Sequence, residues 1–204
     1  MHIAVSGNIG SGKTTLTEKL AKHYGWKAEF EAVENNPYLA DFYEDMQRWS
    51  FHLQVYFLNS RFNQIQKIRE SKFSIVQDRT IYEDAYIFAA NLHKSNLITE
   101  RDYQNYLNLF NSMIDYVKAP DLLIYLKADI PKLVGQIEKR GRDYENSMRI
   151  DYLKNLNVHY EEWIGGYDKG NLLIVDVNNL DFVARPEDFS TIVEKIDREI
   201  NGLF

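Results

Sequence analysis

The chain lacks cysteine, and this excludes a disulfide framework and any metal site built on thiolates. No apolar run approaches the length of a membrane span, and the N-terminus enters a predicted strand at once, which leaves no room for a signal peptide. Basic residues are also in the minority, with 24 Lys and Arg against 30 Asp and Glu, which argues against broad nucleic-acid binding. We therefore expect a cytoplasmic protein that binds neither nucleic acid nor a membrane.

Proline is scarce as well. The four prolines, at positions 37, 120, 131 and 186, each fall near an expected element boundary. The sequence has no repeat, no low-complexity tract and no segment with the composition of a linker. A chain of 204 residues suits one domain with a sizeable core, so we expect a single domain over residues 1–204.

Strand and helix patterns alternate along the chain. Short apolar or alternating runs predict strands at 2–6, 28–33, 73–78, 122–126 and 172–175. Helical spacing predicts helices at 13–24, 47–71, 81–92, 99–117, 130–140, 146–162 and 186–201. This order predicts an α/β fold with a five-stranded parallel sheet flanked by helices on both faces. Ligands bind such a sheet beyond the carboxyl ends of its strands.

A glycine-rich motif follows the first predicted strand. Residues 7–14 fit G-x-x-x-x-G-K-[ST], in which the glycines let backbone N–H groups point at an anion beside a helix N-terminus. Lys13 adds a positive charge near the β- and γ-phosphates, and Thr14 adds a hydroxyl for Mg²⁺. The sequence therefore predicts a phosphate loop that binds ATP with Mg²⁺, made of Gly7, Asn8, Ile9, Gly10, Ser11, Gly12, Lys13, Thr14 and Thr15.

Charged residues follow two more of the predicted strands. Glu34 follows the second strand, and Asp78 and Arg79 close the third. Carboxylates at strand ends beside a phosphate loop either hold Mg²⁺ and its waters or accept a proton from an attacking hydroxyl. A turn cap at Glu34 and a simple pairing of Asp78 with Arg79 are the structural alternatives.

Two predicted helices carry polar and aromatic residues that share a face. Gln54 and Arg61 are seven residues apart on the long helix, which suits a planar ligand with donors and acceptors. Asp84 and Phe88 are four apart on the next helix, where Asp84 is placed to pair with Arg61 and Phe88 to stack on a base. An arginine that reaches solvent and a satisfied helical glutamine would explain the first pair equally well.

A basic cluster, Lys139-Arg140-Gly141-Arg142-Asp143, separates two predicted helices. Its composition favours a small arginine-bearing lid at about 136–146 that closes on transferring phosphoryl oxygens. A solvated helix end is the alternative, because basic residues are favourable near a helix C-terminus.

In their order and spacing these motifs resemble the deoxyribonucleoside kinase family, and in particular its bacterial deoxyadenosine/deoxyguanosine kinase branch. The matching segments are 7–15, 33–37, Tyr43 with 48–54, 78–84, 140–142 and 151–153, so the resemblance spans residues 3 to about 163. It implies a P-loop kinase, usually a homodimer, that transfers the γ-phosphate of ATP to the 5′-hydroxyl of a deoxyribonucleoside.

The resemblance also implies roles for residues on the acceptor side. Glu34 is similar to the base that takes the proton of the 5′-hydroxyl, although Asp78, which helps to hold Mg²⁺, is sometimes assigned that role. Arg79 resembles the arginine that contacts the 5′-oxygen. Tyr43 and Asp151 match the pair that binds the sugar 3′-hydroxyl, and Gln54 and Phe88 match the residues that contact the base. An arginine–aspartate pair like Arg61 and Asp84 goes with purine or deoxycytidine substrates, so we expect deoxyadenosine, with deoxyguanosine or deoxycytidine as alternatives.

On the donor side, Arg140 and Arg142 resemble lid arginines on the ATP phosphates. Asp181 and Phe182 align loosely with residues at the adenine of ATP. Gln136 departs from the family pattern, because some members carry another lid arginine there.

Two other functions are weighed against this interpretation. A nucleoside monophosphate kinase needs arginines for the acceptor phosphate, and the 34–62 region offers mainly Arg48 and Arg61. A regulatory NTP-binding switch protein would read guanine with [NT]-K-x-D; residues 126–129 resemble that motif faintly but begin with leucine, and no D-x-x-G follows the third strand.

Overall fold

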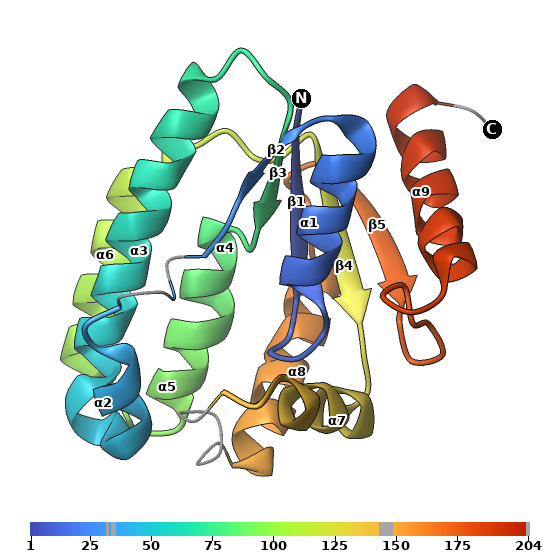
Figure 1. The fold of residues 1–204 in the computed structure, drawn as a ribbon. Helices are drawn as coiled ribbons and strands as arrows, with labels where there is room; N and C mark the ends of the chain where they lie inside the picture. The colour runs from blue at the N-terminus through green and yellow to red at the C-terminus, as the bar shows by residue number, and fades with distance from the viewer. Residues whose placement is uncertain (32, 34–35, 143–148, 203–204) are drawn as a thin grey trace.

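A twisted parallel sheet forms the centre of the computed structural model, which describes residues 1–31, 33, 36–142 and 149–202 (Figure 1). Its strands are β1 (His2–Gly7), β2 (Lys27–Glu29), β3 (Ile75–Asp78), β4 (Leu122–Lys127) and β5 (Asn171–Asp176). They lie in the order β2-β3-β1-β4-β5, and every neighbouring pair is parallel. The central strands are almost wholly buried, which explains why they read as short apolar runs. The predicted fold class is confirmed.

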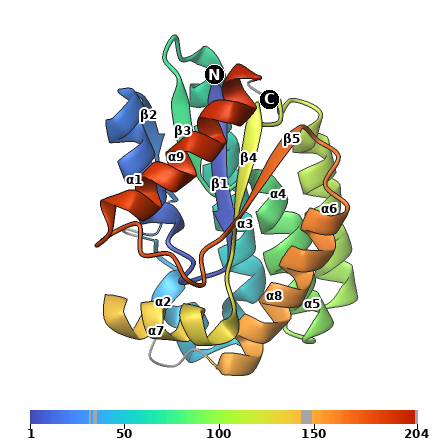
Figure 2. The same cartoon turned by 90° about the vertical axis from the view of Figure 1, so that its right-hand side faces the viewer.

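Helices cover both faces of the sheet, as Figure 2 shows. On one face lie α1 (Lys13–Tyr24) and α9 (Pro186–Asn201), which pack on the sheet around an apolar core that includes Val5, Leu16 and Ile196. The other face is covered by α3 (Met46–Glu70), α6 (Glu100–Ile114), α8 (Ile150–Gly165) and the helical segment 81–94. In the described part of the chain, no helix has the length and apolar character that a membrane crossing requires.

Two further helices lie at the carboxyl ends of the strands (Figure 1). These are α2 (Leu39–Glu44), which the sequence did not predict, and α7 (Ile130–Arg140). Together with the loop between β1 and α1 they surround the edge where a parallel sheet binds its ligands.

The second strand is shorter than the sequence predicts. Strand β2 ends at Glu29, opposite Gln77 of β3, whereas alternation predicted a strand to residue 33. Pairing stops there because β3 itself ends at Asp78 and the chain turns sharply at Arg79, with φ 70°. Residue 31 is therefore released from the sheet to contact other elements.

The predicted helix 81–92 is not a regular α-helix. It consists of α4 (Ile81–Glu83), the π-helical segment η1 (Asp84–Ala89) and α5 (Ala90–Lys94). The wider π turn occurs where the helix passes the carboxyl end of β3, a placement typical of π segments at functional sites. The helix predicted at 146–162 corresponds to α8, which begins at Ile150 and ends at Gly165. Residues 146–148 of the predicted range lie outside the described residues.

Candidate active site

The phosphate loop has the backbone geometry that its glycines predict. Gly10 and Gly12 have φ values of 86° and 95°, in the left-handed region that favours glycine. A Cβ at Gly10 would lie 2.6 Å from the Leu133 carbonyl oxygen, and one at Gly12 would lie 2.8 Å from the ring of Phe182. Neither position has room for a side chain, so the curled backbone that cradles an anion requires both glycines.

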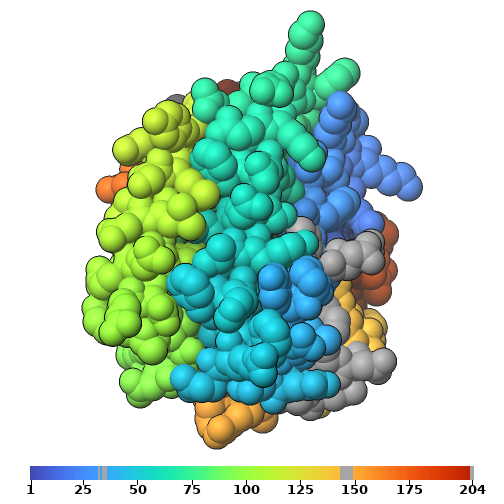
Figure 3. All heavy atoms as spheres, turned by 90° about the vertical axis from the view of Figure 1, so that its left-hand side faces the viewer, coloured from blue at the N-terminus to red at the C-terminus, as the bar shows by residue number. Residues whose placement is uncertain are grey.

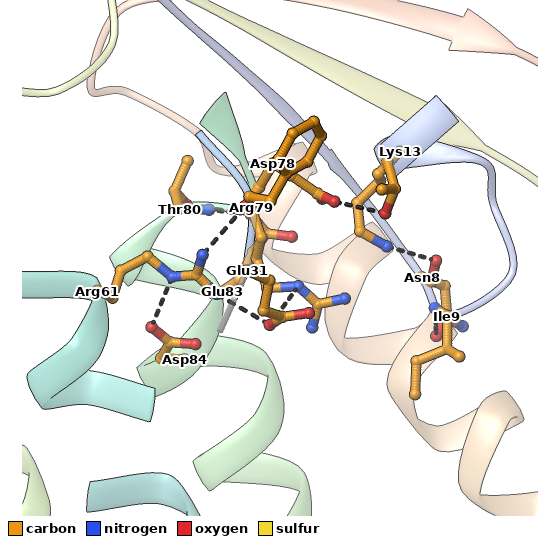
Figure 4. Close-up of polar contacts among 12 residues, drawn as sticks. Asn8, Ile9, Lys13, Glu31, Arg61, Asp78, Arg79, Thr80, Glu83 and Asp84 are labelled. Atoms are coloured by element: carbon orange, nitrogen blue, oxygen red, sulfur yellow. Dashed lines mark hydrogen bonds and ion pairs between the residues drawn. The ribbon is translucent and has the colours of Figure 1, made fainter. Parts of the chain in front are cut away.

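The loop lysine is buried and held by the loop itself. The Nζ of Lys13 donates a hydrogen bond to the Asn8 carbonyl oxygen at 3.0 Å (Figure 4). Burial and, to a smaller extent, the nearby Arg79 charge lower the pKa of Lys13 to about 8, although Asp78 partly opposes both. The charged form of Lys13 is therefore disfavoured by burial, and an anionic ligand would stabilise it.

Helix α8 anchors the other side of the loop. The amide Nδ2 of Asn8 donates to the Leu153 carbonyl oxygen and to Asn157 Oδ1, both at 3.0 Å. Asn157 in turn donates from Nδ2 to the Ala128 carbonyl oxygen at 3.3 Å. These bonds fix the loop against a rigid element rather than leaving it to solvent.

A hydroxyl and a carboxylate meet where the loop passes the end of β3. The Oγ1 of Thr14 donates to Asp78 Oδ2 at 2.6 Å, and Asp78 Oδ1 is buried with no hydrogen-bond partner among the described residues. Oxygen ligands of this kind suit Mg²⁺, which keeps several waters and needs only one or two protein groups. The two residues predicted as metal ligands are thus adjacent, and the unpartnered oxygen fits a cation.

Two arginines share one carboxylate, that of Glu31. The Nη2 of Arg61 donates to Glu31 Oε1 at 2.9 Å, and Arg79 Nε lies 3.3 Å from the same oxygen (Figure 4). Burial raises the pKa of Glu31, but Arg79 and Arg61 together outweigh it, and the net shift is downward. Glu31 therefore stays ionised at neutral pH and is oriented toward the end of β3.

The predicted pairing of Arg61 with Asp84 is present and buried. Arg61 Nε lies 3.3 Å from Asp84 Oδ2, and Arg61 Nη1 donates to the Asp78 carbonyl oxygen at 3.0 Å. Burial raises the pKa of Asp84 to about 6, although the Arg61 charge opposes this shift. The guanidinium thus holds three separate segments of the chain together.

Gln54 and Phe88, which are predicted to contact the base, line the same cavity as Asp84. Gln54 is buried, and its Oε1 has no hydrogen-bond partner among the described residues. The Arg79 guanidinium lies 4.3 Å from the centre of the Phe88 ring. An amide with an unused acceptor and an aromatic ring are the groups that would orient a planar ligand.

A cavity of about 430 Å³ brings most of these side chains together. Its polar and aromatic lining includes residues from the phosphate loop, the strand ends and the helices: Lys13, Thr14, Glu31, Tyr43, Gln54, Asp78, Arg79, Asp84, Phe88, Arg140, Arg142 and Tyr152. The volume is within the range typical of small-molecule sites. Tyr43, Arg140 and Arg142, which the resemblance assigned to the sugar and to the donor phosphates, therefore face the same space as Lys13.

Other predicted residues lie elsewhere. Glu34 lies outside the described residues. Asp151 is exposed, lies 3.7 Å from Arg149 and 4.0 Å from Lys154, and is not among the residues that line the cavity. Its proposed contact with the sugar 3′-hydroxyl stays a prediction.

The two residues expected at the adenine have structural contacts. Phe182 is buried in the core beside Gly12. The Asp181 carboxylate accepts hydrogen bonds from the backbone N–H groups of Val183 and Ala184, and these bonds are the leading reason that its pKa lies below the ordinary value. Both residues therefore shape the loop that supports the back of the phosphate loop, and their contact with ATP stays a prediction.

Sequence reasoning missed Glu31. The alternation over 28–33 placed it inside a strand, so the search for strand-end carboxylates started at Glu34. The signal that would have found it is the length of β2: once the strand ends at Glu29, Glu31 is the first carboxylate beyond the sheet edge.

Fold and site together define a phosphate-loop kinase with a cavity beside its loop. The family model described as deoxynucleoside kinase matches residues 3–201. The chain belongs to this deoxynucleoside kinase family, and it phosphorylates deoxynucleosides with a nucleotide as donor. This finding favours the nucleoside kinase over the monophosphate kinase and the switch protein.

Curated and solved relatives agree over nearly the whole chain. A deoxyadenosine/deoxycytidine kinase of Bacillus subtilis is 40% identical over 196 residues, which cover 95% of this chain and 90% of the relative. A deoxyguanosine kinase of the same organism is 32% identical over 95% of both chains. The structure of a deoxyadenosine kinase from M. mycoides with bound dATP has a TM-score of 0.86 and 31% identity, and covers 97% of this chain and 99% of its own.

Proposed function

We propose that the preferred acceptor of this kinase is deoxyadenosine, with deoxyguanosine and deoxycytidine as further substrates, and that ATP is the donor. The observation that carries this preference is the buried Arg61–Asp84 pair, together with the unpartnered amide oxygen of Gln54, which lines the same cavity as Asp84. Carboxylate and amide oxygens accept hydrogen bonds from an exocyclic amine, and the guanidinium donates to a ring nitrogen or carbonyl oxygen. The names of the similar relatives, deoxyadenosine kinases among them, support the same choice.

For the reaction itself we propose Glu31 as a proton acceptor from the sugar 5′-hydroxyl. It is ionised, oriented by two arginines and lines the same cavity as Lys13. Phosphoryl transfer depends mainly on positioning and charge, so an oriented carboxylate of low basicity suffices to guide the attacking oxygen. Arg79 is placed to contact the 5′-oxygen and the transferring phosphoryl group.

Thr14 and Asp78 would hold Mg²⁺, as their chemistry and the unpartnered Asp78 oxygen support. When bound, Mg²⁺ supplies positive charge to the β- and γ-phosphates of the donor. Lys13 binds the same phosphates from the loop, and Arg140 and Arg142 complete the positive surroundings from the proposed lid at about 136–146, of which residues 143–146 lie outside the described residues.

A substrate panel tests the proposed preference. ATP-dependent phosphorylation of the four deoxynucleosides, with adenosine as a fifth acceptor, is measured for the wild type and for Asp84→Ala. We expect deoxyadenosine to have the highest kcat/KM, and Asp84→Ala to lower it at least about tenfold because a buried partner of the base is lost. Asp168→Ala, which removes an exposed carboxylate paired with Lys169, is the matched control and should leave the profile unchanged. A preference for thymidine would overturn the argument from Arg61 and Asp84 but not the reaction.

A second pair of variants tests the proton acceptor. Glu31→Gln and Glu34→Gln keep side-chain size and remove one charge each. If Glu31 accepts the proton, Glu31→Gln lowers kcat by about 10²- to 10⁴-fold, the usual contribution of general base catalysis, and Glu34→Gln has a smaller effect. The opposite order would return the role to Glu34.

We also propose that the protein is a cytoplasmic homodimer. Helices α3 and α6 lie side by side and form one broad face of the molecule (Figure 3). The partly buried aromatic side chains of residues 49–62 on α3, several of which also pack against the core, are the proposed contribution to the interface. Light scattering after size exclusion decides the point, with a mass near 48 kDa expected for two chains of 24.0 kDa each.

A further inference from the structure

Arg79 occupies a backbone conformation that is costly for its residue type. Its φ of 70° is in the left-handed region, and among the described non-glycine residues only Asn96 shares a positive value. Asparagine tolerates this region, whereas a long side chain without a local hydrogen bond persists there only when its surroundings enforce it. The side chain is also buried, between Glu31 and the ring of Phe88.

The residues on each side of this turn are fixed by hydrogen bonds. The Arg79 N–H donates to the Val5 carbonyl oxygen at 2.9 Å, which ties the turn to β1. Thr80 follows in an extended conformation and caps α4 with a reciprocal capping box, in which Glu83 Oε2 accepts from Thr80 N at 2.8 Å and from Thr80 Oγ1 at 3.1 Å (Figure 4).

The carboxylate of this capping box is in an unusual place, because Glu83 is fully buried. A capping carboxylate normally faces solvent, and a buried one needs a donor for every oxygen. Here the second oxygen, Oε1, accepts a hydrogen bond of 2.9 Å from the hydroxyl of Tyr160, a fully buried residue of α8. Three donors from two distant segments therefore hold Glu83.

Glu83 also acts on the charges of the site. It is one of the negative groups, after Glu31, that keep the pKa of Arg79 above its ordinary value although burial opposes this. It also opposes the downward shift of the pKa of Lys13. Displacement of Glu83 would thus disturb both the backbone and the electrostatics of the proposed phosphate-contacting arginine.

We propose that Tyr160 and Glu83 are positioning residues, which hold the left-handed Arg79 turn in place from helix α8. Asn157, three residues earlier on the same helix, bonds Asn8 of the phosphate loop. A single helix therefore sets the turn and the loop relative to each other. The inference rests on the proposed role of Arg79 in phosphoryl transfer.

A tyrosine of the neighbouring strand provides a matched control for the test. Tyr125 of β4 is as deeply buried as Tyr160, and the two rings stack with centroids 5.9 Å apart. Its hydroxyl donates to Glu161, a carboxylate that is partly exposed, and not to Glu83. Tyr160→Phe and Tyr125→Phe each remove one hydroxyl from the same buried pair.

Steady-state kinetics with ATP and deoxyadenosine distinguish positioning from simple stability. We expect Tyr160→Phe to lower kcat about 10- to 100-fold while both KM values change less than about threefold, because misplaced supporting groups slow the chemical step more than binding. Tyr125→Phe should stay within about twofold of the wild type. Melting temperatures of both variants show whether each remains folded at the assay temperature.

A double-mutant cycle completes the test. If the two residues act as one unit, Tyr160→Phe combined with Glu83→Gln loses no more kcat than Glu83→Gln alone. Equal kcat for the two tyrosine variants, or additive losses in the cycle, would overturn the inference. Arg79→Ala separates this failure from that of its premise: if Arg79→Ala retains the wild-type kcat, the proposed role of Arg79 is wrong instead.

Discussion

Replacement of the buried lysine in the phosphate loop should stabilise the protein while it destroys activity. Lys13 is only 7% exposed, and its ammonium group donates a hydrogen bond of 3.0 Å to the Asn8 carbonyl oxygen. Burial lowers its pKa from 10.5 to about 8. Lys13→Met keeps the length of the side chain and removes the buried charge.

The size of the effect follows from the pKa. A shift from 10.5 to about 8 means that the charged lysine costs the ligand-free fold about 3 kcal/mol at pH 7. Between pH 8 and 10.5 the unfolded chain binds more protons at this group than the folded chain, so stability rises with pH over this window. The cost therefore shrinks to between about 1 and 2 kcal/mol at pH 9.5.

Urea denaturation without nucleotide, at pH 7 and pH 9.5, measures this difference. Lys13→Met should be more stable than the wild type by up to about 3 kcal/mol at pH 7, and the gap should narrow by roughly half at pH 9.5. Lys22→Met, on the exposed side of the same helix, is the control and should show no such pH dependence. A variant less stable than the wild type at pH 7, or a gap that does not narrow, would refute the reasoning.

Three further outcomes follow from the site. Gly12→Ala should lose ATP affinity and about 1–3 kcal/mol of stability, measured by titration and denaturation, because φ is 95° and its Cβ would meet the Phe182 ring. Thr14→Val should raise the Mg²⁺ concentration for half-maximal rate several-fold, since its hydroxyl and Asp78 form the proposed site. With deoxyadenosine, wild-type kcat/KM should fall as pH drops through about 6, where Asp84 gains a proton, and Asp84→Asn should show a flat profile over the same range.

Local patterns made the fold predictable. The strands of the sheet interior are short apolar runs that the sequence shows directly. The left-handed backbone of the phosphate loop was predictable because glycine occupies the positions that need it. The ends of elements were predicted less accurately, because pairing partners decide them: β2 stops at Glu29, opposite Gln77, one residue before β3 itself ends. The π-helical turn at Asp84–Ala89 also has no periodic signal of its own.

The site was predicted most directly where residues lie near the ends of strands. Asp78 ends β3, Arg79 follows it, and Lys13 comes after the short loop that follows β1, so the parallel topology alone brings them to one edge of the sheet. The pairing of Asp84 with Arg61 could be predicted only by assuming which faces of their two helices pack together. Their contact confirms the predicted pairing.

Glu31 and Tyr160 could not be found in this way, because their partners lie far away in the sequence and no sequence motif contains both members of either pair. The Glu31 carboxylate reaches Arg61 only after its strand has ended early, and Tyr160 reaches Glu83 from a helix 77 positions further along the chain. Each satisfies a buried charge that local sequence leaves unpaired. Buried charges such as Arg79 and Glu83 are therefore the informative residues to start from, since a folded protein must supply partners for them. Where the partners come from separate elements, as here, the pairing fixes the relative positions of the elements that carry the proposed chemistry.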